Sequence, residues 1–539
     1  MTIFLVGVKT KIMLFTSYEF IIFVAVLLGL YYIVPKRFQW ILLLGASYIF
    51  YWTSNPAYLL YIGVTTVTVY IAARKIEENA NLQAEYIKQH KEDLSKEEKK
   101  EYKKQQKKIR FRIAALFVCL NIGILAVVKY ANFFLSNLSS LFSLENSIPV
   151  LDLILPMGIS FYTFQAVGYL VDVYRGTIKA EKNLFRFALF ISFFPQLVQG
   201  PISRYGDLSK TLYDQHPFET KNVAYGLQRV LWGFFKKLIV ADRIFAAVST
   251  ILTNLDEYQG MYLIVGMIFY TIQLYADFTG GIDVTIGIAQ ALGIEVQENF
   301  NLPYFSMSLK EYWRRWHISM CNWFRDYVFY PVSSSNALQK FAKFSRKHFG
   351  DSIGKRLPVY VASFVVWFST GLWHGANWNF IVWGLANWAV LMISEELEPL
   401  YAKFHSKVNV KEKKLYQVFC MLRTFLLVCC LNLFDCYSSV ADTFRAFLSM
   451  IRVWNWQVLW NGALLEIGLS VLDYWIILFG ILVMLTVSIV KCKTNVRDYI
   501  VSKPYPVRFV VWFGLFVIVL LMGTYGIGYD SSQFIYNQF

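Results

Sequence analysis

Charged residues are scarce in this chain of 539 residues: only 16% are Asp, Glu, Lys or Arg, whereas 56% are hydrophobic. A soluble globular domain carries about 25% charged residues, so this composition is too apolar for a water-soluble fold. The same figures exclude a disordered chain and a small disulfide-rich scaffold. Length and hydrophobicity together therefore predict a polytopic membrane protein, in which each span needs about 20 mostly apolar residues.

Metal-ligand spacing and strand patterns are also missing. The seven cysteines are scattered, mostly through apolar stretches, so the sequence predicts neither a disulfide framework nor a metal site. Alternating strand patterns do not occur, and an open sheet cannot face lipid. We expect an all-α fold with ten to fourteen transmembrane and re-entrant helices. They would form one integral-membrane domain over residues 1–539, with the last spans within 415–526.

Positive charge predominates, with a formal net charge of +16. Because the basic residues lie between hydrophobic segments, they indicate cytoplasmic loops facing anionic lipid rather than nucleic-acid binding. The hydrophilic run 74–112 has Glu and Lys at i,i+4 spacing, which predicts a solvated cytoplasmic hairpin of helices or, alternatively, a platform for a partner. The basic stretch 491–508 would also be cytoplasmic. Three spans before residue 74 place the N-terminus outside, and the acidic tail around Asp530 fits an outside C-terminus.

The first of two unusual histidines, His317, lies within residues 309–332. This segment predicts an amphipathic helix at the membrane interface, with charges on one side and an apolar side formed by Trp313, Trp316, Met320, Trp323 and Phe324. A basic helix at the headgroups, with His317 as one more polar group, would explain the same pattern.

The second unusual histidine, His374, lies between two hydrophobic segments and is preceded by Gly371 and followed by Gly375. An ionisable group near membrane depth is costly and usually marks function. Small residues allow close backbone approach, and irregular backbone is tolerated at that depth where it lines a cavity. A structural histidine bonded to a neighbouring carbonyl is the alternative.

The two imidazoles suggest base catalysis on a hydroxyl acceptor, because neutral imidazole, with a pKa of about 6.5, accepts a proton near neutral pH. Attack of that hydroxyl on a thioester would also need donors for the developing oxyanion. This role, or substrate binding, is open to the second histidine and to Asn377, Trp378, Trp373 and Trp316. No Gly-X-Ser-X-Gly elbow occurs and no cysteine lies beside either histidine, which argues against a covalent triad.

Four further charged residues lie in apolar surroundings: Asp172, Arg204, Asp277 and Asp283. Each would be costly in lipid, so we expect them to face a shared interior and to pair with Arg or backbone N–H groups. Structural pairing is the favoured interpretation, and substrate contact is the alternative.

The strings Trp313-Arg-Arg-Trp-His317-Ile-Ser, Trp323-Phe-Arg-Asp-Tyr327 and Gly371-Leu-Trp-His374-Gly-Ala-Asn-Trp378 together resemble the membrane-bound O-acyltransferase superfamily. Within it, the chain is most similar to the bacterial branch of alginate O-acetylation membrane subunits, and teichoic-acid D-alanylation proteins are near relatives. Polar islands at 155–176, 193–208, 234–243 and 275–293 also look like that branch. The resemblance covers about residues 10–395.

The resemblance implies helices around a central funnel in a bacterial cytoplasmic membrane. His374 would be the catalytic base, and His317 would help form the site where a cytoplasmic tunnel meets an opening to the outside. A thioester such as acetyl-CoA would supply an acetyl group, with no bound cofactor. The acceptor would be a cell-envelope or exported polysaccharide, or the serine of an extracytoplasmic SGNH-type protein that relays the acetyl group.

Two alternatives remain at the level of sequence. The first stays within the family: a D-alanyl transferase to teichoic acid that takes its acyl group from a carrier protein. The second is a proton-coupled transporter or flippase, in which His and Asp residues would form a proton relay. The sequence shows no evident inverted repeat, which weighs against a transporter.

Overall fold

The computed structural model describes residue 13, residues 15–142 and residues 150–525. Regular structure in these residues is entirely helical, which confirms the all-α prediction. The chain divides into two compact units: Met1–Gly226 with Ile288–Val296, and Leu227–Gly287 with Gln297–Phe539. The tail around Asp530, used above to predict an outside C-terminus, lies outside the described residues.

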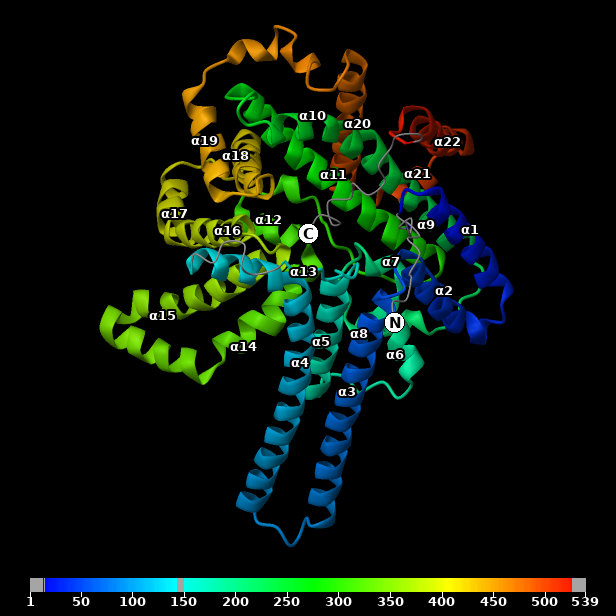
Figure 1. The fold of residues 1–539 in the computed structure, drawn as a ribbon, viewed down its shortest axis with the longest axis vertical. Helices are drawn as coiled ribbons and strands as arrows, with labels where there is room; N and C mark the ends of the chain where they lie inside the picture. Colours follow the sequence, from blue (N-terminus) through cyan, green and yellow to red (C-terminus); the bar gives the residue numbers. More distant parts are fainter. Residues whose placement is uncertain (1–12, 14, 143–149, 526–539) are drawn as a thin grey trace. The chain divides into compact units, whose positions relative to one another are not determined.

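The first unit holds the helices of the N-terminal part of the chain, drawn from blue to blue-green in Figure 1. They are α1 (Tyr18–Ile33), η1 (Lys36–Phe38), α2 (Gln39–Ser54), α3 (Tyr58–Gln89), α4 (Lys96–Leu141), α5 (Ile159–Arg175), α6 (Leu184–Ser192), α7 (Phe194–Leu197) and α8 (Tyr205–Leu212). Helix α9 (Thr220–Phe234) begins in this unit and ends in the second.

Residues 74–112 lie in α3 and α4, two long antiparallel helices joined by a short turn (Figure 1). The turn ends in a capping box, in which the Ser95 side chain accepts from Glu98 N and the Glu98 carboxylate accepts from Ser95 N. Polar side chains join the two helices, for example Asn79 Nδ2 donating to Gln106 Oε1 at 2.7 Å. The alternation of Glu and Lys on these surfaces thus belongs to a solvated helix pair.

The second unit holds most of the remaining helices. They are η2 (Phe235–Ala241), α10 (Asp242–Thr253), α11 (Met261–Ala291), η3 (Pro303–Phe305), α12 (Leu309–Arg315), α13 (Ile318–Phe324), η4 (Arg325–Phe329), α14 (Tyr330–Ser333), α15 (Asn336–His374), α16 (Trp378–Glu396), α17 (Glu398–Lys407), α18 (Lys414–Asn432), η5 (Leu433–Asp435), α19 (Val440–Arg452), η6 (Trp456–Leu459), η7 (Ala463–Leu465), α20 (Val471–Lys491), α21 (Val496–Val501) and α22 (Tyr505–Met522). Of these, η2 and η4 are π-helical segments.

Within the described residues, six helices are long and apolar enough to cross a membrane. They are α3, α4, α11, α18 with its continuation to Asp435, α20 and α22. The bent pair α16 and α17, which meet at 46°, would make a seventh. This is fewer than the ten to fourteen predicted, because several apolar segments form short or broken helices; residues 224–250, for example, are divided among α9, η2 and α10.

Candidate active site

The chain breaks its helix at His317, between α12 and α13. His317 adopts a left-handed conformation with φ 46° and ψ 51°, which is uncommon for a residue other than glycine. Two backbone hydrogen bonds to the preceding segment hold the break, since Asn301 N donates to Arg315 O and Ile318 N donates to Asn299 O. The prediction of one amphipathic helix over 309–332 is therefore wrong, because backbone hydrogen bonds to the preceding segment interrupt the helix at His317.

The imidazole of His317 is buried and is held by the side chain of Asn299. Asn299 Oδ1 accepts from both the backbone N and the hydroxyl of Ser319, each at 2.9 Å. This leaves the amide Nδ2 facing His317 Nδ1 at 3.3 Å. Nδ1 also lies 3.4 Å from Asn299 Oδ1, but Ser319 already donates twice to that oxygen. The donor Nδ2 is therefore the group available to Nδ1, which favours the tautomer with the ring proton on Nε2. Asn299 therefore presents His317 as an Nε2–H donor.

His374 is the last residue of α15, and Gly375 follows it in an extended conformation. Helices α15 and α16 approach very closely here: a Cβ at Gly371 would lie 2.4 Å from Phe380 O, and one at Gly384 would lie 2.4 Å from Trp367 O. Glycine at these positions is required by the close packing of the two helices. The packing places the His374 ring 4.6 Å from the Trp383 ring, centroid to centroid.

The rings of both histidines lie next to the ring of one tryptophan, Trp373. The buried ring of Trp373 lies 6.0 Å from the His317 ring and 5.1 Å from the His374 ring, between centroids. Burial, together with the nearby His374 imidazole, holds the pKa of His317 well below its usual value. His317 is therefore neutral at physiological pH and keeps one N–H donor.

Trp383 is a residue that sequence reasoning missed. Its indole Nε1 is buried and has no hydrogen-bond partner within the part of the chain that the structure describes. A buried indole N–H normally finds an acceptor, so this one is suited to an acceptor atom of a substrate. No sequence motif distinguished it from the other tryptophans; only its packing on His374 does so.

The remaining predicted donors have different surroundings. Asn377 caps α16 by accepting from Asn379 N at 2.9 Å, and its Nδ2 donates to Ser438 O at 3.0 Å. Trp378 begins α16 and is 53% exposed. Trp316 is buried in an aromatic cluster, with its ring 4.9 Å from that of Phe300. Their predicted roles as substrate-binding or oxyanion residues stay predictions.

The two acidic residues of α11 are both paired with buried cations. Asp277 lies 2.5 Å from Lys237 Nζ, which also contacts Asp242 at 2.7 Å.

Asp283 lies 2.6 Å from Lys236 Nζ and 2.8 Å from Arg229, which forms a second, bidentate pair with Glu298. The sequence identified the carboxylates as residues that need partners but did not identify those partners. Two of them, Lys236 and Lys237, are adjacent in the sequence within an apolar run.

Asp172 and Arg204 belong to the first unit, whereas Asp277 and Asp283 belong to the second. Asp172 is on α5, and its backbone carbonyl accepts from Thr177 N at the helix end. Arg204 is the N-terminal capping residue of α8. No cluster of three or more His, Cys, Asp and Glu residues that could hold a metal ion is found among the described residues.

Comparison with known proteins shows the family of the chain. The family model "MBOAT, membrane-bound O-acyltransferase family" matches residues 179–345, which include His317. The probable alginate O-acetylase AlgI of Pseudomonas aeruginosa is 32% identical over 478 residues, covering 87% of this chain and 81% of the relative. The chain belongs to the membrane-bound O-acyltransferase family.

Two other relatives carry different names. The peptidoglycan O-acetyltransferase of Helicobacter pylori is 30% identical over 53% of this chain and 55% of its own length. The teichoic acid D-alanyltransferase of Bacillus subtilis is 31% identical over 45% of this chain and 60% of its own length. The present membrane-bound O-acyltransferase is therefore a multi-pass membrane enzyme of polysaccharide modification.

Proposed function

We propose that this enzyme moves an acetyl group from a cytoplasmic thioester, such as acetyl-CoA, across the bacterial cytoplasmic membrane. The acceptor would be a hydroxyl of an extracytoplasmic polysaccharide, or the serine of an SGNH-type protein that relays the acetyl group to it. The observation that carries the proposal is the placement of His317 and His374 around Trp373. The names of the alginate and peptidoglycan O-acetylating relatives support acetyl as the transferred group.

His374 would act as the general base. Its imidazole takes the proton of the acceptor hydroxyl while the oxygen attacks the thioester carbonyl carbon. The tetrahedral intermediate then collapses, the carbon–sulfur bond breaks, and the departing thiolate takes the proton back from the imidazolium. No covalent enzyme intermediate is needed, and a positioned base contributes about 10²–10⁴-fold in rate.

His317 and Trp383 would stabilise the oxyanion. A neutral His317 with its proton on Nε2 is a donor, and the Trp383 indole N–H is a second donor beside His374. Donors fixed before the reaction lower the barrier because they need no reorganisation as the negative charge develops. The two histidines would thus divide the work, one as base and the other as donor.

D-alanyl transfer from a carrier protein is less well supported, because the relative of that name matches less than half of this chain. The two activities differ in the group that the envelope loses when the gene is deleted. Loss of alkali-labile acetate supports the proposal, whereas loss of D-alanine with acetate unchanged would overturn it.

The catalytic assignment is tested with His374→Ala in a strain that lacks the wild-type copy. We expect acetate released from the polysaccharide by mild alkali to fall by about 10² or more, with normal abundance in the membrane. His90→Ala, at the exposed turn of the α3–α4 hairpin, is the matched control and should retain acetylation. Retained acetylation in the His374→Ala strain at normal abundance would remove the base assignment.

A further inference from the structure

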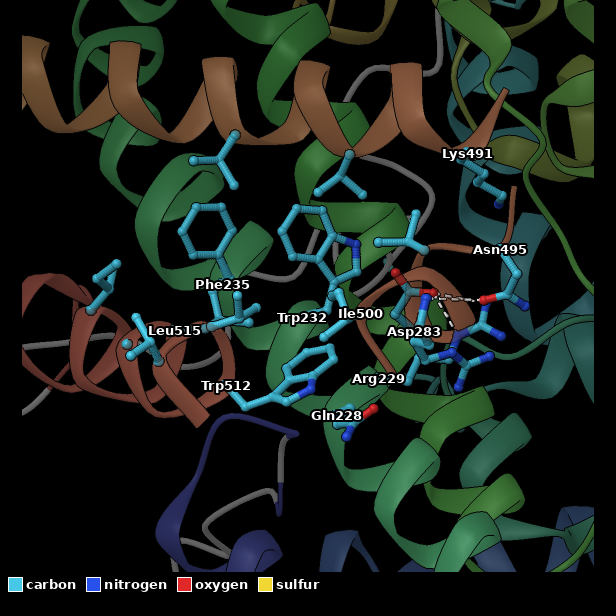
Figure 2. A pocket seen from close by; sticks show the side chains of 18 of the residues that line it. Gln228, Arg229, Trp232, Phe235, Asp283, Lys491, Asn495, Ile500, Trp512 and Leu515 are labelled. Atoms are coloured by element: carbon cyan, nitrogen blue, oxygen red, sulfur yellow. Dashed lines mark hydrogen bonds and ion pairs between the residues drawn. The ribbon is translucent and has the colours of Figure 1, made fainter. Parts of the chain in front are cut away.

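A second site lies away from the histidines, in a cavity of about 760 Å³ lined by parts of α9, η2, α11, α20, α21 and α22 (Figure 2). Its volume is within the range of small-molecule sites. The proposed acyl transfer does not use it, and its C-terminal walls lie beyond the segment that carries the histidine motifs.

One end of the cavity is apolar. Helix α20 contributes Phe479, Val483 and Val487 at intervals of four residues, so the three side chains form one stripe along the helix. The opposite walls come from α22 and from aromatic rings. Figure 2 shows Trp232, Phe235, Trp512 and Leu515 gathered on this side. The stripe continues at the same interval to Lys491, about 18 Å from Phe479 along the helix axis.

The other end is charged and predominantly basic. Figure 2 places Lys491, Asn495, Arg229 and Asp283 together there. Arg229 and Lys236 are already paired with Asp283 and Glu298 at 2.6–2.8 Å, and these four charges balance one another. The lining adds a further cation, Lys491. The charged end therefore carries an excess of positive charge. It adjoins the apolar channel, which is the part of the cavity between the α20 stripe and the opposite walls.

We propose that this cavity binds one anionic phospholipid of the membrane, with an acyl chain along the α20 stripe and its phosphate at Lys491. The apolar channel favours an acyl chain over water, because burial of the chain removes apolar surface from water. The excess positive charge matches a phosphodiester, and basic residues at the membrane surface attract anionic lipid. A neutral lipid would fill the same channel but would gain nothing at the basic end.

A lysine at the end of a spanning helix often reaches toward the headgroups without binding any one lipid. The two interpretations differ in stoichiometry and selectivity. A headgroup-facing lysine attracts anionic lipid loosely and does not depend on the channel. A bound lipid uses both the basic end and an open channel, so removing the positive charge must weaken its retention and blocking the channel must abolish it.

The test uses the full-length protein, purified in detergent, depleted of lipid and mixed with equal amounts of phosphatidylglycerol and phosphatidylcholine carrying the same acyl chains. Native mass spectrometry counts the lipids retained. We expect one phosphatidylglycerol per chain, retained in preference to phosphatidylcholine. Lys491→Gln should weaken this retention about fivefold, whereas Lys493→Gln, an exposed residue two positions on that does not line the cavity, should leave it unchanged.

The channel itself is blocked by Gly514→Phe. Gly514 lines the cavity, and a Cβ there would meet no atom within 4 Å, so the new ring enters open space. Retention of both lipids should be lost. Gly123→Phe on α4, where a Cβ also meets no atom within 4 Å, is the control and should retain phosphatidylglycerol.

Lys491→Gln leaves the apolar walls intact and keeps the test decisive if Gly514→Phe fails to fold. Equal retention of the two lipids, or retention that neither variant changes, would overturn the proposal. So would a copurifying polypeptide in place of the lipid.

Discussion

Among single residues, Asn299 has a specific effect on the site, because its amide favours one nitrogen of His317 as the carrier of the ring proton. The amide nitrogen and oxygen lie 3.3 Å and 3.4 Å from His317 Nδ1, but two bonds from Ser319 occupy the oxygen, so the nitrogen is the group available to bond Nδ1. A donor at Nε2 suits an oxyanion, whereas a bare Nε2 would repel it. Asn299 is thus a positioning residue that would act on the reaction through His317.

Asn299→Asp should reverse this arrangement. A carboxylate accepts a hydrogen bond from Nδ1–H, moves the ring proton away from Nε2 and raises the pKa of His317. Above that raised pKa the oxyanion donor is missing, and we expect kcat to fall by about 10²–10³. Below it, the imidazolium regains Nε2–H. The ratio of variant to wild-type kcat should therefore increase as the pH falls.

The pH profile separates this role from a purely structural one. Asn299→Ala removes the amide without supplying a carboxylate, so its kcat should be low at every pH. If Asn299→Asp and Asn299→Ala show the same flat ratio to wild type, the residue only supports the fold, and the assignment of His317 as a donor loses its basis.

At the scale of helices, the contact between α15 and α16 sets the position of His374. Gly371→Val adds a side chain where even a Cβ would lie 2.4 Å from Phe380 O. The helices must separate, at a cost of about 1–3 kcal/mol in the free energy of unfolding. A shift of about 1 Å in a catalytic group can lower the rate 10²-fold. We therefore expect the rate of acetyl transfer to fall by more than the loss of folded protein explains.

The control for this variant is Gly123→Val, which makes the same exchange on α4 where a Cβ meets open space. It shares the change in helix propensity but not the overlap. Acetylation and the thermal midpoint in detergent are measured for both variants. Equal activity in the two would show that the α15–α16 contact does not position His374.

The ion cluster of Lys237, Asp277 and Asp242 ties η2 to α11 and α10. Lys237→Met should leave two carboxylates without this buried cation, which costs about 3–5 kcal/mol of unfolding free energy. Lys104→Met breaks only an exposed pair with Glu101 and should cost about 0–1 kcal/mol. Denaturation in mixed micelles measures both, and similar losses in the two variants would contradict a structural role for the cluster.

Each of these elements could be predicted from the sequence only where the residues that determine it lie close together along the chain. The helical periods and the cap at Ser95 are local, and they were readable from neighbouring residues. The break at His317 depends on Asn299, which is 18 residues away, and no local signal indicates it. For the same reason the sequence identified His374 through its glycines but gave no means of selecting Trp383 from among the tryptophans.

For the whole molecule, hydropathy predicted the fold class correctly but not the number of long helices. Apolar residues 357–372, for example, do not form a helix of their own but belong to α15, which has a sharp kink at Gly350, where φ is 72°. Such a bend is set by backbone geometry that composition does not record. The distribution of basic residues predicts an orientation, with the segment after α20 in the cytoplasm because it is rich in lysine and arginine.

That orientation predicts opposite locations for the two ends of α20. Asn461 precedes the helix, Ser502 follows it, and both are exposed. We expect Asn461→Cys to react with a membrane-impermeant maleimide in spheroplasts, and Ser502→Cys to react only after permeabilisation. Lys91→Cys, in the turn of the α3–α4 hairpin, should behave like Ser502→Cys because the positive-inside bias predicts a cytoplasmic location for both.

The background for these labels must lack the exposed native thiols, so the parent carries Cys119→Ser and Cys492→Ser. Acetylation by the parent shows that it is folded. Labelling of Ser502→Cys in intact spheroplasts would show that α20 has the opposite orientation. Its basic end would then lie in the outer leaflet, and the excess positive charge would face outside. If Lys91→Cys alone were labelled, the predicted orientation of α20 would stand and only that of the hairpin would be wrong, because the two sites report on different helices.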